Sequence, residues 1–196
     1  VPGDTGELFG ASSKTRVNSI LRLPVGAGEL SLVVNGVQLE AENPGSLNAD
    51  AIESGERPAN GFNVRQQTDK NVSQAQVGLR WAGRAAALDV DAAGWYIGRQ
   101  LDNRIPPSII DLSRNAGGAR VSLGSGIGGS LMWTLGGQVQ LQRDDRLNRA
   151  NDAGTPGDLT LDQKESVTNA AGFARLSWTP GERFEARADV RTDWYT

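Results

Sequence analysis

The stretch LTLDQKESVTNAAGFARLSWTPGERFEARADVRTDWYT, residues 159–196, decides the fold class of this chain. Small and apolar residues occupy every second position from Ala170 to Trp178, and again from Phe184 to Val190. A period of two is the pattern of an extended strand with one apolar and one polar face. The step Pro180-Gly181 lies between the two segments and predicts a tight reversal, so we expect a β-hairpin here.

The two faces of this hairpin indicate its surroundings. Along the second segment the charges of the polar face alternate in sign, as expected for a wall that faces water, whereas the apolar face carries no charge. A transmembrane β-barrel is built from segments of about ten alternating residues with one face toward lipid. The alternative that one hairpin leaves open is a soluble barrel or sandwich, in which the apolar face is the core.

The same alternation recurs along the chain and predicts about eight strands. Four short turns are expected near residues 26, 83, 127 and 181, and longer polar loops at 43–65, 102–108 and 144–158. Outer-membrane barrels combine short periplasmic turns with longer outer loops in this way. The predicted fold is therefore all-β, with antiparallel up-and-down strands of a transmembrane β-barrel.

Three tryptophans support the membrane interpretation. Trp81, Trp133 and Trp178 fall on the apolar face, each close to a short turn. Tryptophan collects at the boundary between membrane and water, where its ring meets lipid and its N–H meets polar groups. The alternative is that these rings are core aromatics of a soluble β-protein.

The composition excludes several other classes of protein. The chain has 196 residues, a net charge of −3, and neither cysteine nor histidine. No apolar run is long enough for a transmembrane helix. The two missing residue types remove disulfides, thiol chemistry, the usual zinc sites and histidine-based catalysis. The mild acidity and scattered arginines argue against a nucleic-acid partner.

Two motifs that suggest chemistry have simpler explanations. Residues 124–129, GSGIGG, fit the dinucleotide fingerprint, but the chain continues as an alternating strand instead of the helix that the fingerprint requires. Asp89 and Asp91 share one face of a strand, and Arg80 on the neighbouring strand is the expected ion-pair partner. We therefore expect no enzyme, and no catalytic residue, cofactor or metal ion.

Several segments resemble the barrel of TonB-dependent outer-membrane receptors. They are LDNRIPPSIIDLSR at 101–114, GGAR at 117–120, QRDDRLN at 142–148, LDQKE at 161–165 and GFARLSW at 172–178. The resemblance covers most of the chain from about Asn43 onward. It implies a 22-stranded barrel, plugged by an N-terminal domain, that imports ferric siderophores or similar nutrients with energy relayed from the inner membrane.

The resemblance also implies a place and partners for the chain. Residues 1–196 would be a segment of the barrel domain, about eight strands of a longer polypeptide, without the plug domain. The location implied is the outer membrane of a Gram-negative bacterium. The implied partners are outer-membrane lipid and lipopolysaccharide, the receptor's own plug domain, the ferric siderophore or other nutrient, and an energy-coupling periplasmic protein that acts through the full-length receptor.

Candidate ligand contacts lie in the outer loops and strand tops of such a receptor. The arginines expected there are Arg99, Arg104, Arg114, Arg143 and Arg146. Guanidinium groups suit anionic iron chelates. The alternative is that these arginines pair with lipopolysaccharide phosphates or with neighbouring acids.

A second set of charges would line the inside of the barrel, where they meet water and the plug. It consists of Arg120, Arg175, Arg187 and Arg191 with Asp89, Asp91, Glu185 and Asp189. Two other functions stay open at this point. One is a complete eight-stranded outer-membrane barrel with a structural or adhesive role, and the other is a soluble barrel that holds a small ligand.

Overall fold

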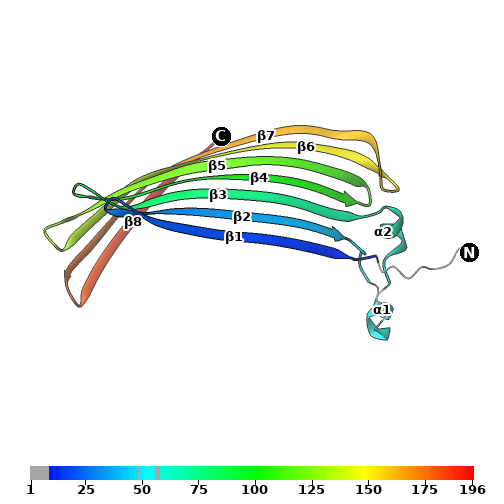
Figure 1. The fold of residues 1–196 in the computed structure, drawn as a ribbon, viewed down its shortest axis with the longest axis horizontal. Helices are drawn as coiled ribbons and strands as arrows, with labels where there is room; N and C mark the ends of the chain where they lie inside the picture. The colour runs from blue at the N-terminus through cyan, green and yellow to red at the C-terminus, as the bar shows by residue number, and fades with distance from the viewer. Residues whose placement is uncertain (1–8, 48, 56–57) are drawn as a thin grey trace, which may run out of the picture.

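The computed structural model describes residues 9–47, 49–55 and 58–196, and eight strands form one antiparallel sheet in it. The strands are β1 (Ser12–Val25), β2 (Gly28–Glu42), β3 (Asp69–Ala85), β4 (Leu88–Ile105), β5 (Ser108–Ile127), β6 (Leu131–Asp152), β7 (Thr155–Gly181) and β8 (Phe184–Tyr195). They are hydrogen-bonded in the order β1 to β8 (Figure 1). The predicted all-β, up-and-down antiparallel topology is confirmed.

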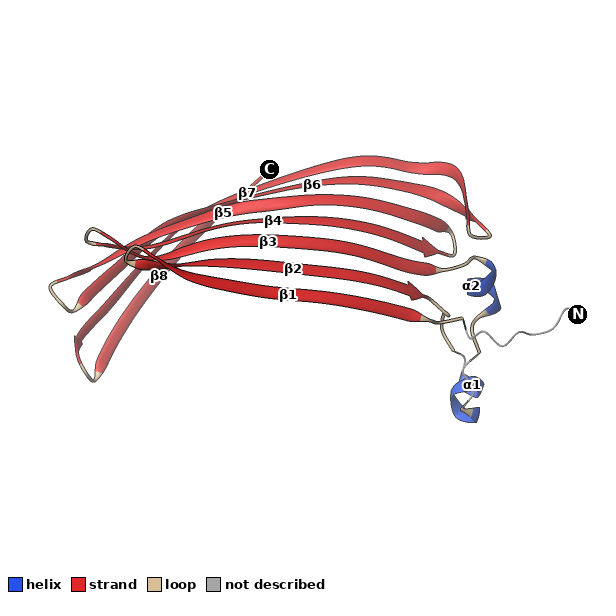
Figure 2. Ribbon diagram, in the orientation of Figure 1, coloured by secondary structure: helices blue, strands red, loops and turns tan. Residues whose placement is uncertain are grey.

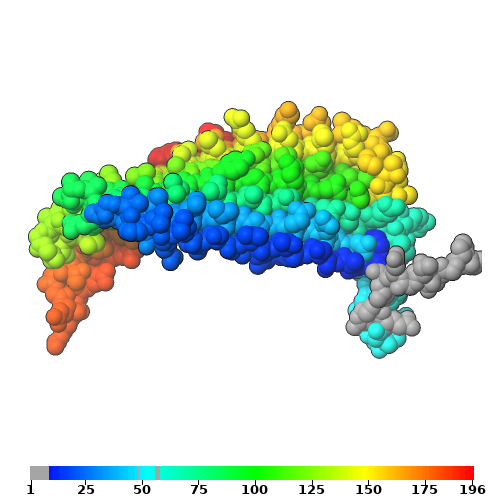
Figure 3. Space-filling model, viewed as in Figure 1, coloured from blue at the N-terminus to red at the C-terminus, as the bar shows by residue number. Residues whose placement is uncertain are grey.

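The sheet is open at both edges. Among the described residues, β1 pairs only with β2, and β8 pairs only with β7. The strands lie side by side as a single curved layer (Figure 2), and the space-filling view shows one continuous wall (Figure 3). The sheet is therefore a wall with two free edges, not a closed barrel.

The four short turns lie at one end of the sheet, as expected. They fall at residues 26–27, 86–87, 128–130 and 182–183, within a few residues of the predicted positions. The predicted reversal at Pro180-Gly181 is wrong by two residues, because both residues continue β7 and the chain turns at 182–183. The pairing register shifts between Trp178 and Gly181, which forms a bulge that accommodates a proline without an N–H donor.

The predicted loops at 102–108 and 144–158 are wrong. Only Pro106 and Pro107 separate β4 from β5, and only Ala153 and Gly154 separate β6 from β7. Both residues of the second turn have positive φ, 53° and 88°, as a two-residue hairpin of the type I′ class requires. The strands extend beyond the apolar part of the sheet, where both faces are polar, so their sequence has the composition of a loop.

The third predicted loop, 43–65, contains two short helices. These are α1 (Ala49–Ser54) and α2 (Gly61–Arg65), and both lie at the end of the sheet opposite the short turns (Figure 1). Two hydrogen bonds between Thr68 and Asn43 join the end of this connection to its beginning. The Thr68 hydroxyl donates to the carbonyl oxygen of Asn43 at 2.7 Å, and the Asn43 N–H donates to the Thr68 carbonyl at 2.8 Å. The connection is thus anchored at its base instead of being wholly exposed.

The pairing register sorts the side chains into two faces. One row crosses all eight strands through Leu21, Leu32, Leu79, Gly94, Ala119, Val139, Ala170 and Trp194. With its parallel rows it forms an uncharged surface, here called the apolar band, made by alternate residues of 17–25, 30–36, 75–81, 90–96, 117–123, 133–141, 170–178 and 186–194. Trp81, Trp133 and Trp178 lie on this face, as predicted from the sequence.

The apolar band is exposed. Its larger side chains, such as Leu79, Leu135 and Leu176, are open to the surroundings, and the buried hydrophobic residues of the described chain are only Ala51, Val72, Ile109 and Ala171. Neither described helix is long and apolar enough to cross a membrane. The described residues therefore fold as a layer without a hydrophobic core of the usual size.

Candidate functional site

The face opposite the apolar band carries the charges expected for a water-filled interior. The register and the alternation along β8 place all eight predicted residues there: Arg120, Arg175, Arg187, Arg191, Asp89, Asp91, Glu185 and Asp189. We call this surface the polar face. Its proposed contact with water and a plug domain stays a prediction.

Ion pairs cross from strand to strand on the polar face. Arg80 Nε lies 3.1 Å from each carboxylate oxygen of Asp91, and its Nη2 lies 2.5 Å from Oδ2. Arg84 Nε lies 3.4 Å from Asp89 Oδ1, because the register sets these two residues directly opposite. The prediction of Arg80 as the partner is confirmed for Asp91, whereas Asp89 pairs with Arg84.

A second group of pairs lies on β7 and β8, where Arg175–Asp189 joins the two strands and the other two pairs lie within β8. Asp189 accepts from Arg175 Nε at 2.5 Å and from Arg187 Nε at 2.9 Å. Arg191 binds Asp193 through two nitrogens, at 2.7 and 2.8 Å. Most of these side chains are about half exposed, so water screens the pairs and each adds little to stability. Their main consequence is a fixed pattern of charge on the polar face.

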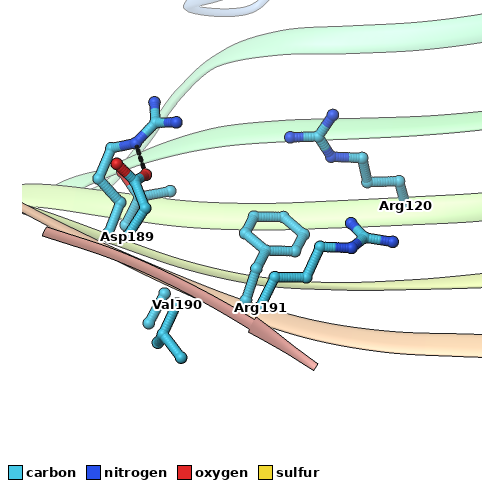
Figure 4. Close-up of a pocket in the computed structure, with 8 residues that line it drawn as sticks. Arg120, Asp189, Val190 and Arg191 are labelled. Atoms are coloured by element: carbon cyan, nitrogen blue, oxygen red, sulfur yellow. Dashed lines mark hydrogen bonds and ion pairs between the residues drawn. The ribbon is translucent and has the colours of Figure 1, made fainter. Parts of the chain in front are cut away.

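A pocket of about 450 Å³ opens on the polar face between β5 and β8. Arg120, Arg175 and Arg191 line it together with a single acid, Asp189. Figure 4 shows Asp189 and Arg191 on the same side of β8 as Arg120, with Val190 pointing away. Arg175 and Arg191 are already paired with Asp189 and Asp193, so Arg120 is the guanidinium group of the pocket left to bind an anion such as a carboxylate.

Phe173 supports this pocket, although the sequence indicates no role for it. Its ring lies directly across from Gly136, where an added Cβ would collide with the ring. The guanidinium carbon of Arg120 lies 4.9 Å from the ring centroid, a cation–π distance. An aromatic ring set opposite a glycine on a polar face is the sequence signal that could have identified this contact.

The predicted ligand-contact arginines do not form one cluster. Arg99 and Arg114 are direct neighbours across β4 and β5, and Arg146 lies on the same polar side of β6. Arg104 and Arg143 lie on the other side of the sheet, the side of the apolar band, beyond its edge. The alternation of the strands separates residues that the sequence places in one region.

Two of these arginines bind neighbouring acids. Arg114 holds Asp144 with both ends of its guanidinium group, at 2.8 Å from Nε and 2.5 Å from Nη2, and Asp144 is 3% exposed. This carboxylate keeps the pKa of Arg114 above its usual range. Arg104 Nη1 lies 2.9 Å from Asp69 Oδ2, and burial raises the pKa of the Asp69 carboxyl despite that partner.

The other three arginines differ in their surroundings. Arg146 Nε donates to Asn148 Oδ1 at 3.1 Å. Arg99 Nε is buried and has no hydrogen-bond partner among the described residues. Arg143 is exposed, with no side-chain hydrogen bond or ion pair to the described part of the chain. Arg143 is therefore the predicted site residue most available to a ligand.

Comparison with known proteins does not assign a function to these surfaces. Neither a protein-family model nor a curated protein matches this chain. Within the described ranges, no group of three or more acidic side chains is arranged to hold a metal ion. The relation to outer-membrane receptors stays a prediction based on the segments quoted above.

Proposed function

We propose that this chain is part of the wall of a transmembrane β-barrel in the outer membrane of a Gram-negative bacterium. The barrel would belong to an active-transport receptor for ferric siderophores or similar nutrients, energised by an inner-membrane complex. The observation that carries the proposal is the apolar band, which crosses all eight strands without a charged residue while its larger side chains stay exposed. An exposed apolar surface of this kind is stable in contact with lipid.

The height of the apolar band fits a bilayer. On β6 it runs from Trp133 to Leu141, nine residues. At about 3.4 Å per residue this is roughly 30 Å of strand, close to what a tilted strand needs to cross the hydrocarbon core. Trp81, Trp133 and Trp178 lie near the short-turn end of the band, where an interfacial belt would be.

The open edges favour a barrel larger than eight strands. A strand edge in hydrocarbon leaves unpaired N–H and C=O groups, and each of them costs several kcal/mol. The free edges of β1 and β8 therefore need neighbouring strands, which a wide barrel supplies. A closed eight-stranded barrel with a structural or adhesive role remains the alternative, and it requires a β1–β8 pairing.

The transport role rests on the resemblance of the quoted segments to TonB-dependent receptors. The polar face supports it, because its ion pairs and arginine-lined pocket suit a wide, wet interior that accommodates a plug domain. In the assembled receptor the chain would contact its own plug, lipid and lipopolysaccharide, and an energy-coupling periplasmic protein would act through the full-length protein. Of the arginines beyond the band, those on the polar side, Arg99, Arg114 and Arg146, would meet an anionic chelate.

Cysteine labelling tests the membrane topology, because the chain has no native cysteine to interfere. Ser54→Cys lies in the α1 connection, and Glu182→Cys lies in a short turn at the opposite end. An impermeant thiol reagent applied to whole cells should label the first variant and not the second. Labelling of both, or of Glu182→Cys alone, contradicts the proposed orientation.

Growth under iron limitation tests the transport role separately. A strain in which the full-length gene is deleted should lose growth on one class of ferric chelate as the iron source, and a plasmid copy should restore it. Unchanged growth and uptake across ferric siderophores and other nutrients that need an energised receptor would refute transport. The membrane location would then still be decided by the labelling.

A further inference from the structure

A groove of about 510 Å³ lies on the side of the apolar band, where the band meets the polar strand extensions. Its floor is Gly117 and Ala119 on β5. Its sides are Tyr96 on β4 and Leu141 on β6, and Arg143 lies at its polar end. We call it the Arg143 groove. Four neighbouring strands, β4 to β7, contribute to it, so it is formed entirely within the described sheet.

The register explains why a groove forms here. Gly117 lies directly between Tyr96 and Leu141, so two large side chains rise on either side of a residue without one. A Cβ at Gly117 would lie 2.9 Å from the carbonyl oxygen of Trp95, so this floor position is restricted to glycine. The Tyr96 hydroxyl is hydrogen-bonded to Asn115 Oδ1, which holds the ring along the side of the groove.

The groove is amphipathic along its length. Its lower part is made by Ala119, Val139 and Leu141 of the apolar band, and its upper end adds Ser166 and Thr168 to Arg143. The guanidinium group is free to bind a ligand, because Arg143 makes no side-chain hydrogen bond or ion pair with the described part of the chain. One end therefore offers donors for an anion, and the rest offers apolar contact.

We propose that the Arg143 groove binds a phosphate-bearing lipid of the surrounding membrane. One acyl chain lies over Gly117 and Ala119, and the phosphate accepts hydrogen bonds from the Arg143 guanidinium group and the Ser166 hydroxyl. The two N–H groups of a guanidinium match two phosphate oxygens. Arg143 lies at the edge of the apolar band, which is the depth at which lipid head groups lie in a membrane. This inference rests on the proposed membrane location, since the band then faces only lipid.

Native mass spectrometry of the full-length polypeptide in detergent tests the site. The delipidated protein is titrated with dimyristoylphosphatidylglycerol, with the matching diacylglycerol, and with inorganic phosphate alone. We expect one tightly retained phosphatidylglycerol and weaker retention of the diacylglycerol. Arg143→Gln should weaken phosphatidylglycerol binding about tenfold, the loss expected for one charge-assisted contact. Ala119→Leu, which fills the floor, should weaken both lipids.

Two matched variants separate a local site from a general surface effect. Lys164→Gln removes one exposed positive charge from the same side of the sheet, at a residue that does not line the groove. Ala92→Leu places the same larger side chain on the apolar band outside the groove. Both variants should bind phosphatidylglycerol as the unmodified protein does.

The other outcomes overturn the lipid site. Equal loss in Arg143→Gln and Lys164→Gln indicates nonspecific charge attraction, and equal retention of both lipids removes the role of the phosphate. Binding of inorganic phosphate as strong as that of the lipid indicates an anion site without an acyl chain. Each of these leaves the membrane location intact, whereas a protein that stays in solution without detergent refutes the proposed function itself.

Discussion

Asn151 donates a hydrogen bond of 2.9 Å from its Nδ2 to the carbonyl oxygen of Gln66, a residue 85 positions earlier in the chain. The same nitrogen donates to the Ile105 carbonyl at 3.0 Å, and Oδ1 accepts from the Gly154 N–H at 2.7 Å. With 8% of its surface exposed, this one side chain joins the α1–α2 connection, the end of β4 and the β6–β7 turn. These three segments lie at the end of the sheet where ligand contacts are proposed.

We predict that Asn151→Ala loosens this end of the sheet without unfolding the rest. Three backbone groups lose their partner, at a cost of about 1–3 kcal/mol in local stability, because they are partly shielded from water. Limited proteolysis should cut the connection between residues 43 and 67 several times faster. Asn18→Ala, on exposed β1, is the control and should not change the rate. An unchanged rate in Asn151→Ala would mean that Asn151 does not hold the connection.

The bidentate pair of Arg114 and Asp144 gives a second prediction. Asp144→Ala should lower the free energy of unfolding by about 1–3 kcal/mol, because it leaves a half-buried guanidinium group without its acceptor. The adjacent Asp145 lies on the other face, is largely exposed, and has only a distant lysine, so Asp145→Ala should cost no more than about 0.5 kcal/mol. Urea titrations of the full-length protein in lipid measure both. Equal costs would contradict the assigned faces of β6.

Glu42 gives a prediction for pH. Its carboxylate accepts the N–H groups of Gly10 and Ala11 at 2.7 and 2.9 Å, and these bonds hold its pKa below the ordinary value. Because the pKa of Glu42 is lowered in the folded state, its attachment to Gly10 and Ala11 is fully present at a pH above the ordinary carboxyl pKa. The attachment is lost as the pH falls through the lowered pKa. Protection of both amides against hydrogen exchange should therefore fall in that acidic range.

The matched variant for this prediction is Glu42→Gln. It keeps the shape of the side chain but has no titrating group, so amide protection at Gly10 and Ala11 should be weaker at neutral pH and independent of acidification. If the unmodified protein keeps its protection below the pKa of Glu42, the carboxylate does not anchor this segment.

The period-two alternation predicts the fold only where the two faces differ in polarity. Inside the apolar band it identified every strand, and it placed Trp81, Trp133 and Trp178 on one face. Beyond the band, residues such as Arg143, Asp144 and Asp145 are polar on both faces, so two strand extensions were predicted as loops. Ladder hydrogen bonds keep them extended, and apart from Pro156, which has no N–H donor, these segments form such bonds whatever the polarity of their side chains.

The candidate site was less predictable, because its contacts connect distant positions. The sequence located the eight charges of the polar face, since alternation alone decides the face. It did not reveal the contact of Asn151 with Gln66, which depends on where the connection folds back. It also grouped Arg104 and Arg143 with Arg99 and Arg114, although the register sets them on opposite sides.

Two adjacent residues of β3 test the assignment of the faces. Val77 lies on the apolar band between Val34 and Tyr96, whereas Gln76 lies on the polar face between Asn35 and Ile97. If the band faces lipid, Val77→Arg places a charge near the bilayer midplane and costs roughly 2–4 kcal/mol. Gln76→Arg should be nearly neutral. Folding titrations of the full-length protein in lipid vesicles measure both, and a reversed order would show that the faces are exchanged.

The free edges of β1 and β8 lead to the last prediction: residues 1–196 alone do not form a stable, transport-competent unit in a membrane. As an open sheet, the segment exposes two rows of unpaired backbone groups to hydrocarbon, each group at a cost of several kcal/mol. Closure into a small barrel removes those rows, but it crowds the polar face. Eight strands enclose only enough space for packed side chains, and Trp95, Phe173 and the arginines of the pocket would have to share it.

Refolding the isolated segment into micelles distinguishes the two outcomes. We expect aggregation or a broad, non-cooperative transition, and no shift in gel migration on heating. A monomer with heat-modifiable migration and one cooperative unfolding transition would mean that β1 and β8 pair with each other, and the complete eight-stranded barrel would replace the larger receptor as the function proposed for this chain.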